Sequence, residues 1–264
     1  MSRLVAFVCA VACVAGLAFW YYRIERVERT GAAEGEHEGD AWVEQLYSQN
    51  PGEAAEAARH VEQLGARALP AIHAVLQDPG ADPKRVKAVL KACGILGHAA
   101  AAAIPEVAEN LADPTLTAEA ATALSFMGRG AFAPLREALG SDDPVVRQEA
   151  LRAIGKLKGR APLDSRAVLP LLIRAMKDPD APVRTVAATY LGIVHEGGGE
   201  AVAALIAGLG DPDANVRRAS ATALGSFGGD AAAAVPALKK AAVDADPEVA
   251  REAGVTLVKL QPGR

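Results

Sequence analysis

Two histidines of this chain are each followed by a glutamate, and such pairs can bind iron. The pairs are His37-Glu38 and His195-Glu196. Imidazole and carboxylate groups are suitable iron ligands, but an iron site needs several of them to converge. The other three histidines have no adjacent acidic residue, and no repeated segment supplies a matching second pair. We therefore predict no metal site and no bound cofactor.

Nucleophilic and phosphate-binding motifs are also missing from the sequence. Cys93 is the only cysteine after residue 13, and a lone cysteine on a helix is typically a small buried apolar residue. The sequence contains no GxxxxGK[ST] phosphate loop, no GxGxxG after a strand and no GxSxG elbow. No residue is therefore a candidate for catalysis.

Three arginines recur in one motif, which is Val-Arg, six further residues, and then Ile or Leu followed by Gly. They could form a stripe that binds anions. They could instead pair with aspartates in the turns and hold successive segments in register, and charged hydrogen bonds favour this second interpretation. The residues of the predicted structural ladder are Arg147, Arg184, Arg217, Asp143, Asp178 and Asp211.

The motif belongs to a longer period that covers residues 41–264. Seven Asp-Pro or Asn-Pro pairs recur with their prolines 30 to 35 residues apart. A period in this range is the signature of stacked repeats. The prolines are Pro51, Pro83, Pro114, Pro144, Pro179, Pro212 and Pro247.

Each repeat contains two stretches with helical periodicity. In the segment 179–194, apolar residues recur three and four positions apart, as in an amphipathic helix. Alanine accounts for 59 residues and aromatic residues for only 4%, a composition that favours helices over strands. Asp before Pro suits a helix start, and glycines such as Gly65 and Gly97 suit a helix end. We predict an all-α chain.

These repeats resemble HEAT repeats, specifically the HEAT-like repeats of phycobilisome lyases. The resemblance covers 41–264 in about seven helix pairs, and it is closest around Arg147, Arg184 and Arg217. It departs at Thr117, which stands at an arginine position, and at Arg251, which is displaced by one residue. The resemblance implies an α-solenoid with Asp between the helices of a pair and the second helices on the concave face.

The uncharged run 4–22 predicts a membrane-spanning helix. At about 1.5 Å per residue it would span about 28 Å, close to the roughly 30 Å hydrocarbon core. Trp20, Tyr21 and Tyr22 close the run, and aromatic rings of this kind favour the headgroup level. A cleaved signal and lipidation at Cys13 are alternatives, but we favour an uncleaved anchor over residues 1–22.

The orientation of this anchor is open to two interpretations. Three arginines follow the run and Arg3 alone precedes it, which favours a cytoplasmic C-terminal side. A short basic start before an apolar run is, however, typical of an export signal. We expect a single-pass protein of the cell membrane, with the repeats on the extracytoplasmic side. Residues 23–40 contain many glycines and charges, so they predict a flexible tether.

The charge balance argues against nucleic acid as a partner. Residues 41–264 contain 24 basic and 26 acidic residues, which gives no general attraction for phosphates. We predict a membrane-tethered, non-catalytic scaffold whose concave face binds another protein. The alternative implied by the resemblance is an enzyme of the bilin-lyase or deoxyhypusine-hydroxylase type, the latter with two irons held by His-Glu pairs. The residues expected to contact a partner are Gln148, Arg152, Thr185, Thr189, Arg218 and Thr222.

Overall fold

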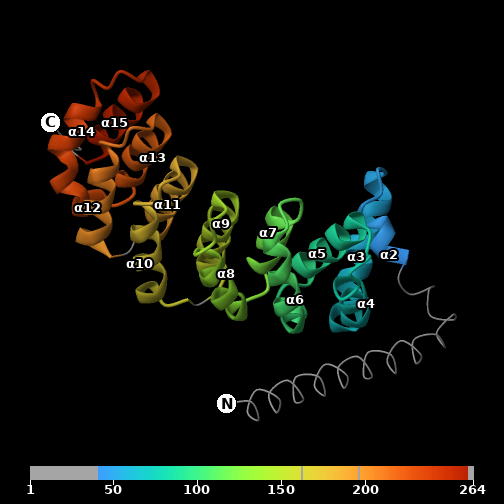
Figure 1. Cartoon of the computed structure of the whole chain (residues 1–264). Helices are drawn as coiled ribbons and strands as arrows, with labels where there is room; N and C mark the ends of the chain where they lie inside the picture. Colours follow the sequence, from blue (N-terminus) through green and yellow to red (C-terminus); the bar gives the residue numbers. More distant parts are fainter. Residues whose placement is uncertain (1–40, 162, 196, 261–264) are drawn as a thin grey trace, which may run out of the picture. The chain divides into compact units, whose positions relative to one another are not determined.

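The computed structural model describes residues 41–161, 163–195 and 197–260, and every regular element in these ranges is a helix (Figure 1). The chain separates into two compact units, Met1–Trp42 and Val43–Arg264. Seven helix pairs follow one another in the described ranges, which confirms the predicted all-α solenoid. The predicted anchor (1–22) and tether (23–40) lie outside the described residues.

The two helices of a pair alternate along the chain, with short 3-10 turns between several of them. The first helices are α2 (Ala41–Gln45), α4 (Leu69–Leu76), α6 (Ile104–Glu109), α8 (Phe132–Ala138), α10 (Ser165–Ala175), α12 (Gly198–Gly208) and α14 (Val235–Ala241). The second helices are α3 (Pro51–Leu64), α5 (Pro83–Leu96), α7 (Thr117–Leu124), α9 (Pro144–Arg160), α11 (Ala181–Val194), α13 (Ala214–Leu224) and α15 (Pro247–Leu260). The 3-10 turns are η2 (Gly65–Ala68), η3 (Gly97–Ala103), η4 (Asn110–Ala112), η5 (Arg129–Ala131) and η6 (Gly228–Ala234).

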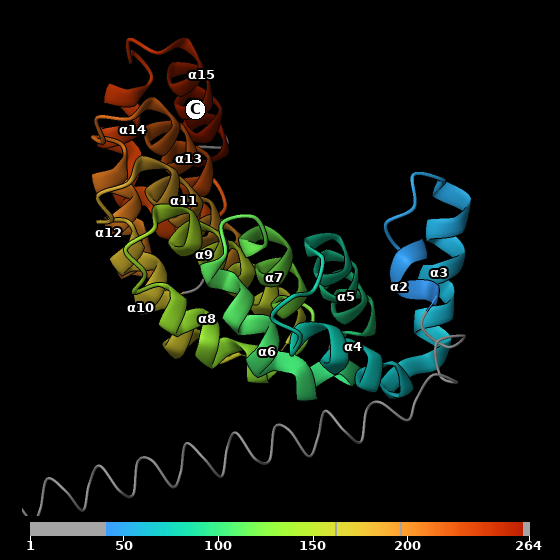
Figure 2. The same cartoon turned by 45° about the vertical axis from the view of Figure 1, so that its right-hand side comes forward.

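The helices of the second unit form two layers. Each second helix packs against the second helix of the next pair, and together these helices form what we call the inner layer. The first helices from α4 to α14 form the outer layer. Figure 2 shows the inner layer on the inside of the curve that this unit follows. Stacking buries an apolar stripe that a single helix pair would leave exposed.

Polar side chains fix where the inner helices begin. The carboxylates of Asp82, Asp143 and Asp213 each accept a hydrogen bond from the backbone N–H two residues later. Proline stands at the first or second position of α5 and α9, where a missing N–H costs nothing. The helix starts that the Asp-Pro pattern predicts are therefore present to within three residues, with the largest offset at α7.

Glycines end two of these helices in a conformation that other residues reach only with strain. Gly65 and Gly97 have φ of 55° and 54°, and a positive φ is expected where a glycine ends a helix. Their ψ values of −134° and −122° differ from those of a left-handed helical cap. The chain therefore turns sharply into η2 and η3 at these residues.

Close contacts between inner helices depend on small residues. A side chain at Gly155 of α9 would overlap the ring of Tyr190 on α11. A Cβ at Gly192 of α11 would lie 2.8 Å from the Cα of Ala223 on α13. Both glycines belong to the repeated Ile/Leu-Gly motif, so the motif marks the point where neighbouring repeats touch.

One described segment is long and apolar enough to cross a membrane. It is Pro83–Ala112, which comprises α5, η3, α6 and η4. Val89 and Leu90 of this segment are fully buried in the solenoid. A core helix passes the same test of length and composition, and these residues belong to the solenoid core.

Replacing Gly155 by alanine tests this packing. We expect Gly155→Ala to destabilise residues 41–264 by about 1–3 kcal/mol, because the ring of Tyr190 must move. Gly159→Ala on the same helix is the matched control, since nothing lies within 4 Å of its added methyl group. That change should be neutral or stabilise by up to about 1 kcal/mol. Urea denaturation measures both, and equal effects would contradict the proposed contact.

Candidate functional site

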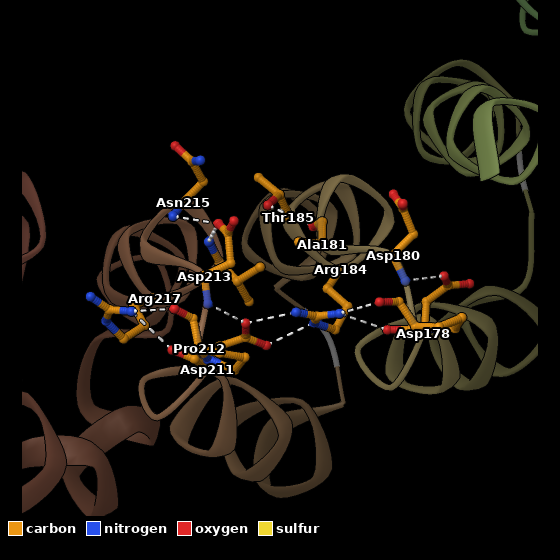
Figure 3. Close-up of polar contacts among 12 residues, drawn as sticks. Asp178, Asp180, Ala181, Arg184, Thr185, Asp211, Pro212, Asp213, Asn215 and Arg217 are labelled. Carbon is orange, nitrogen blue, oxygen red and sulfur yellow. Dashed lines mark hydrogen bonds and ion pairs between the residues drawn. The ribbon is translucent and has the colours of Figure 1, made fainter.

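Arg184 joins the turn before its own helix to the turn of the next repeat. Its Nε and Nη2 donate to the two carboxylate oxygens of Asp211 at 2.7 and 2.8 Å. Its Nη1 donates to the backbone carbonyls of Asp178 and Pro179 at 2.8 and 3.0 Å (Figure 3). One guanidinium thus uses four of its five N–H donors to fix two turns relative to each other.

The same arrangement is found on both sides of Arg184. Arg147 forms a fork with Asp178 at 2.9 Å and donates to two carbonyls in its own turn. Arg217 does the same toward Asp244, at 2.8 and 2.9 Å. The ladder therefore comprises Arg147, Asp178, Arg184, Asp211, Arg217 and Asp244. All six side chains are only 10–17% exposed, so solvent screens these pairs weakly.

Asp143 does not occupy the position that the sequence pattern gave it. Asp178 and Asp211 stand six residues before an arginine, whereas Asp143 stands four before Arg147 and caps α9 through Val145 N–H. The residue six before Arg147 is Ser141, which has no carboxylate. Asp244 holds the ladder position in the last repeat. Its separation from Arg217 was the signal by which the sequence could have identified it.

The Asp-Pro pairs also divide into two kinds. Asp178 and Asp211 do not cap α11 and α13, since the helix caps are Asp180 and Asp213, two residues later. Each ladder aspartate accepts a hydrogen bond from the N–H of that capping residue at 2.9 Å. In an Asp-Pro-Asp turn, the carboxylate of the first aspartate therefore binds arginine, and the second aspartate lies at the helix start.

Thr117 and Arg251 show what replaces the arginine where the motif departs. Thr117 is buried, and its hydroxyl lies 3.0 Å from Leu111 O and 2.7 Å from Asp113 O. It therefore binds the carbonyls of its own turn but is too short to reach the next repeat. Arg251 is exposed and pairs with Glu248 and Glu252 of its own helix.

Two opposing effects set the pKa values of the ladder carboxyls. Burial alone would raise the pKa of Asp178 and Asp211. Hydrogen bonds from arginine and from a backbone N–H, with the nearby arginine charges, outweigh burial and lower both pKa values. For Asp244, the hydrogen bond from Arg217 is the largest effect and lowers its pKa.

Four of the predicted partner-contact residues lie together on the inner layer. Thr185 and Thr189 of α11 and Arg218 and Thr222 of α13 line one hollow of about 550 Å³. The threonine hydroxyls donate to backbone carbonyls four residues earlier, and that of Thr222 also lies 3.3 Å from a carboxylate oxygen of Glu252. Residues that were not predicted as partner contacts complete the hollow, among them Ile193, Asn215, Ser226, Arg251 and Glu252.

The other two predicted contacts lie on α9. Gln148 is half-buried, and the Nε of Arg152 lies 3.3 Å from a carboxylate oxygen of Glu149 one helical turn away. Neither residue lines the α11–α13 hollow.

A second hollow lies between α5 and α7, and sequence reasoning missed it. It measures about 670 Å³, and the exposed rings of Tyr47 and Phe126 stand at its wall. Its other lining residues are Leu90, Lys91, Gly94, Ile95, Ala118, Glu119, Thr122 and Ala123. The available signal was that Tyr47 and Phe126 are two of only six aromatic residues after residue 40.

The metal-binding candidates do not meet in the described part of the chain. Across residues 41–161, 163–195 and 197–260, no three histidine, cysteine or carboxylate side chains gather as ligands would. His195 is exposed, and its Nδ1 lies 3.0 Å from Ile193 O, while Glu196 and His37 lie outside the described residues. Cys93 is buried, as predicted, and burial raises its thiol pKa to about 12.

Comparison with known families gives one match. The sequence profile described as HEAT repeats matches residues 104–192, 132–211 and 169–259. No curated protein sequence matches the chain.

Three solved structures are similar to this chain to different degrees. One from the structure of Kap95p with RanGDP is 15% identical, with a TM-score of 0.57 over 89% of this chain and 37% of that one. An engineered protein is 21% identical over 84% of this chain and 96% of that one, with a TM-score of 0.47. Human deoxyhypusine hydroxylase is 22% identical over 83% of both chains, with a TM-score of 0.40.

Acid should weaken the ladder. A carboxyl whose pKa is lower in the folded chain stabilises it above the unfolded-state value of about 3.9. That stability is lost as the pH falls through the folded-state value, so the free energy of unfolding of residues 41–264 should fall from about pH 5 toward pH 2. We predict that Asp211→Asn costs about 1–3 kcal/mol at neutral pH and flattens this acid dependence.

Asp230→Asn provides the control for this measurement. Asp230 is an exposed residue of η6, outside the ladder, so its replacement should leave the pH dependence unchanged. Denaturation across the pH range distinguishes the variants. An Asp211→Asn protein with the wild-type acid slope would refute the assignment.

Proposed function

The chain belongs to the HEAT-repeat family, and we propose on this basis that it is a membrane-tethered scaffold whose inner layer binds another protein. The proposal is for a non-catalytic role. The near-balance of charge in residues 41–264 supports a protein rather than a nucleic acid as the partner. The ladder residues would then serve to hold the shape of the binding surface.

One observation carries this proposal, namely the hollow between α11 and α13. Side chains from consecutive inner helices, Thr185, Thr189, Arg218 and Thr222, meet there although they are distant in sequence. Thr189 and Thr222 are exposed, and no ladder residue lines the hollow. A concave surface that mixes apolar, hydroxyl and charged side chains suits a broad contact with a folded partner.

The membrane part of the proposal depends on sequence. The run 4–22 would anchor the protein in the bilayer, and residues 23–40 would separate the repeats from it. We propose the extracytoplasmic side for the repeats. A reporter active only outside the cytoplasm, fused after Arg264, tests this, and an inactive but intact membrane-bound fusion would place them in the cytoplasm.

Photo-crosslinking tests the binding role most directly. We predict that a photoreactive residue at Thr189 in the full-length protein yields a defined adduct in its native membrane. The same residue at Ala203, an exposed position of the outer-layer helix α12, should not yield that adduct. The structure places the two positions on different layers, so their difference reports the binding face.

Two results would contradict the scaffold role. Adducts of equal yield and identity at Thr189 and Ala203 would show that contact is not specific to the inner layer. Iron in equal molar amount in the purified protein would instead support the hydroxylase-type alternative.

A further inference from the structure

The hollow between α5 and α7 has an apolar floor and two exposed aromatic rings. Gly94 of α5 faces α7 closely, since a Cβ there would lie 3.8 Å from the Cα of Ala123. The small residues Gly94, Ala118 and Ala123 leave the floor uncovered. Tyr47 and Phe126 are 39% and 40% exposed at its wall. Exposed aromatic surface in a hollow is typical of a binding site for an apolar side chain.

Two rows of cations flank this floor. Lys87 and Lys91 stand four residues apart on α5, and Arg152, Lys156 and Arg160 stand four apart on α9. Residues at this spacing share one face of a helix. Lys91 lines the hollow, and the Arg160 guanidinium lies 4.0 Å from the centre of the Phe126 ring. Since α7 packs between α5 and α9, the two rows come from the helices on either side of it.

Carboxylates neutralise only part of this charge. Lys87 pairs with Glu119 at 3.0 Å, and Arg152 pairs with Glu149 at 3.3 Å. The Lys91 ammonium donates to a backbone carbonyl, that of Leu46. Within the described residues, no ion pair with a carboxylate involves Lys91, Lys156 or Arg160.

The remaining charge is therefore local and positive. The five cations and the two carboxylates that pair with them sum to three positive charges, and Asp113, which also acts on Lys87, reduces this surplus to two, on a chain whose formal net charge is −4. A negatively charged partner would thus be attracted to this part of the inner layer and repelled by the average surface.

We call the hollow between α5 and α7, together with the cations beside it, the groove. We propose that this groove binds an acidic peptide segment of a partner protein, with one apolar side chain placed between Tyr47 and Phe126. The carboxylates of the segment would lie against Lys91 on one side and Lys156 and Arg160 on the other. This inference depends on the scaffold role proposed above and names the chemistry of the partner. The apolar floor favours such a peptide over a phosphate backbone, because only the peptide carries an apolar side chain to cover it.

Fluorescence anisotropy with short labelled peptides tests the groove, using the full-length protein in detergent. The probe is an Asp- and Glu-rich peptide with one central leucine. The first control peptide replaces the leucine by alanine, and the second replaces every acidic residue by lysine. We expect the acidic leucine peptide to bind, the alanine peptide to bind about tenfold more weakly, and the lysine peptide not to bind.

Variants locate the binding to this surface. Phe126→Ala and Lys156→Glu should each weaken binding of the acidic leucine peptide by about tenfold or more. Both side chains are exposed, and matched controls are Val258→Ala on α15 and Lys239→Glu on the outer-layer helix α14. The controls should keep the wild-type affinity.

Several outcomes would overturn the inference. Absence of binding, or binding that neither Phe126→Ala nor Lys156→Glu weakens, would exclude this groove. A single-stranded oligonucleotide that binds as tightly as the peptide and is weakened by Lys156→Glu alone would show a general anion surface. If Thr189 still crosslinks a partner while the acidic peptide fails to bind, the groove assignment falls and the scaffold role stands.

Discussion

The geometry of this solenoid depends on a guanidinium that bonds two turns at once. A stack of helix pairs buried mainly by alanine and leucine could slide, because apolar contact has little directional preference. The fork from Arg184 to Asp211, with the bonds from its Nη1 to Asp178 and Pro179, fixes both the distance and the angle between repeats. The small Gly155 and Gly192 then allow the close approach that this register requires.

The ladder begins at the fourth repeat, because the two residues that would link the third repeat to the fourth are both uncharged. Thr117 stands where the third repeat would have its arginine, and Ser141 stands where the fourth would have the accepting aspartate. Loss of both members together leaves no unpaired buried charge, which would be costly. The amino-terminal repeats are instead linked by apolar packing, by the pairs Lys87–Glu119 and His73–Glu106, and by the bond from Lys91 to Leu46 O. The apolar groove lies in this part of the inner layer.

Periodicity predicted the number and type of elements because the core of a repeat protein is local. The Asp-Pro spacing places seven helix pairs, and Val-Arg identifies the ladder arginines. Asp143 and Asp178 look alike in sequence, since each precedes a proline, and only the six-residue separation from arginine distinguishes them. The α5–α7 groove was not predictable in this way, because it depends on which side chains neighbouring repeats leave uncovered.

A double-mutant cycle on Arg184 and Asp211 tests the central claim most directly. The free energy of unfolding of residues 41–264 would be measured for Arg184→Met, Asp211→Asn, the double variant and the wild type. If the fork links the repeats, the two changes should be coupled by about 1–3 kcal/mol, with the double variant less destabilised than the sum of the single ones. Changes that add to within about 0.5 kcal/mol would show that the pair does not act as a unit, and would contradict the account.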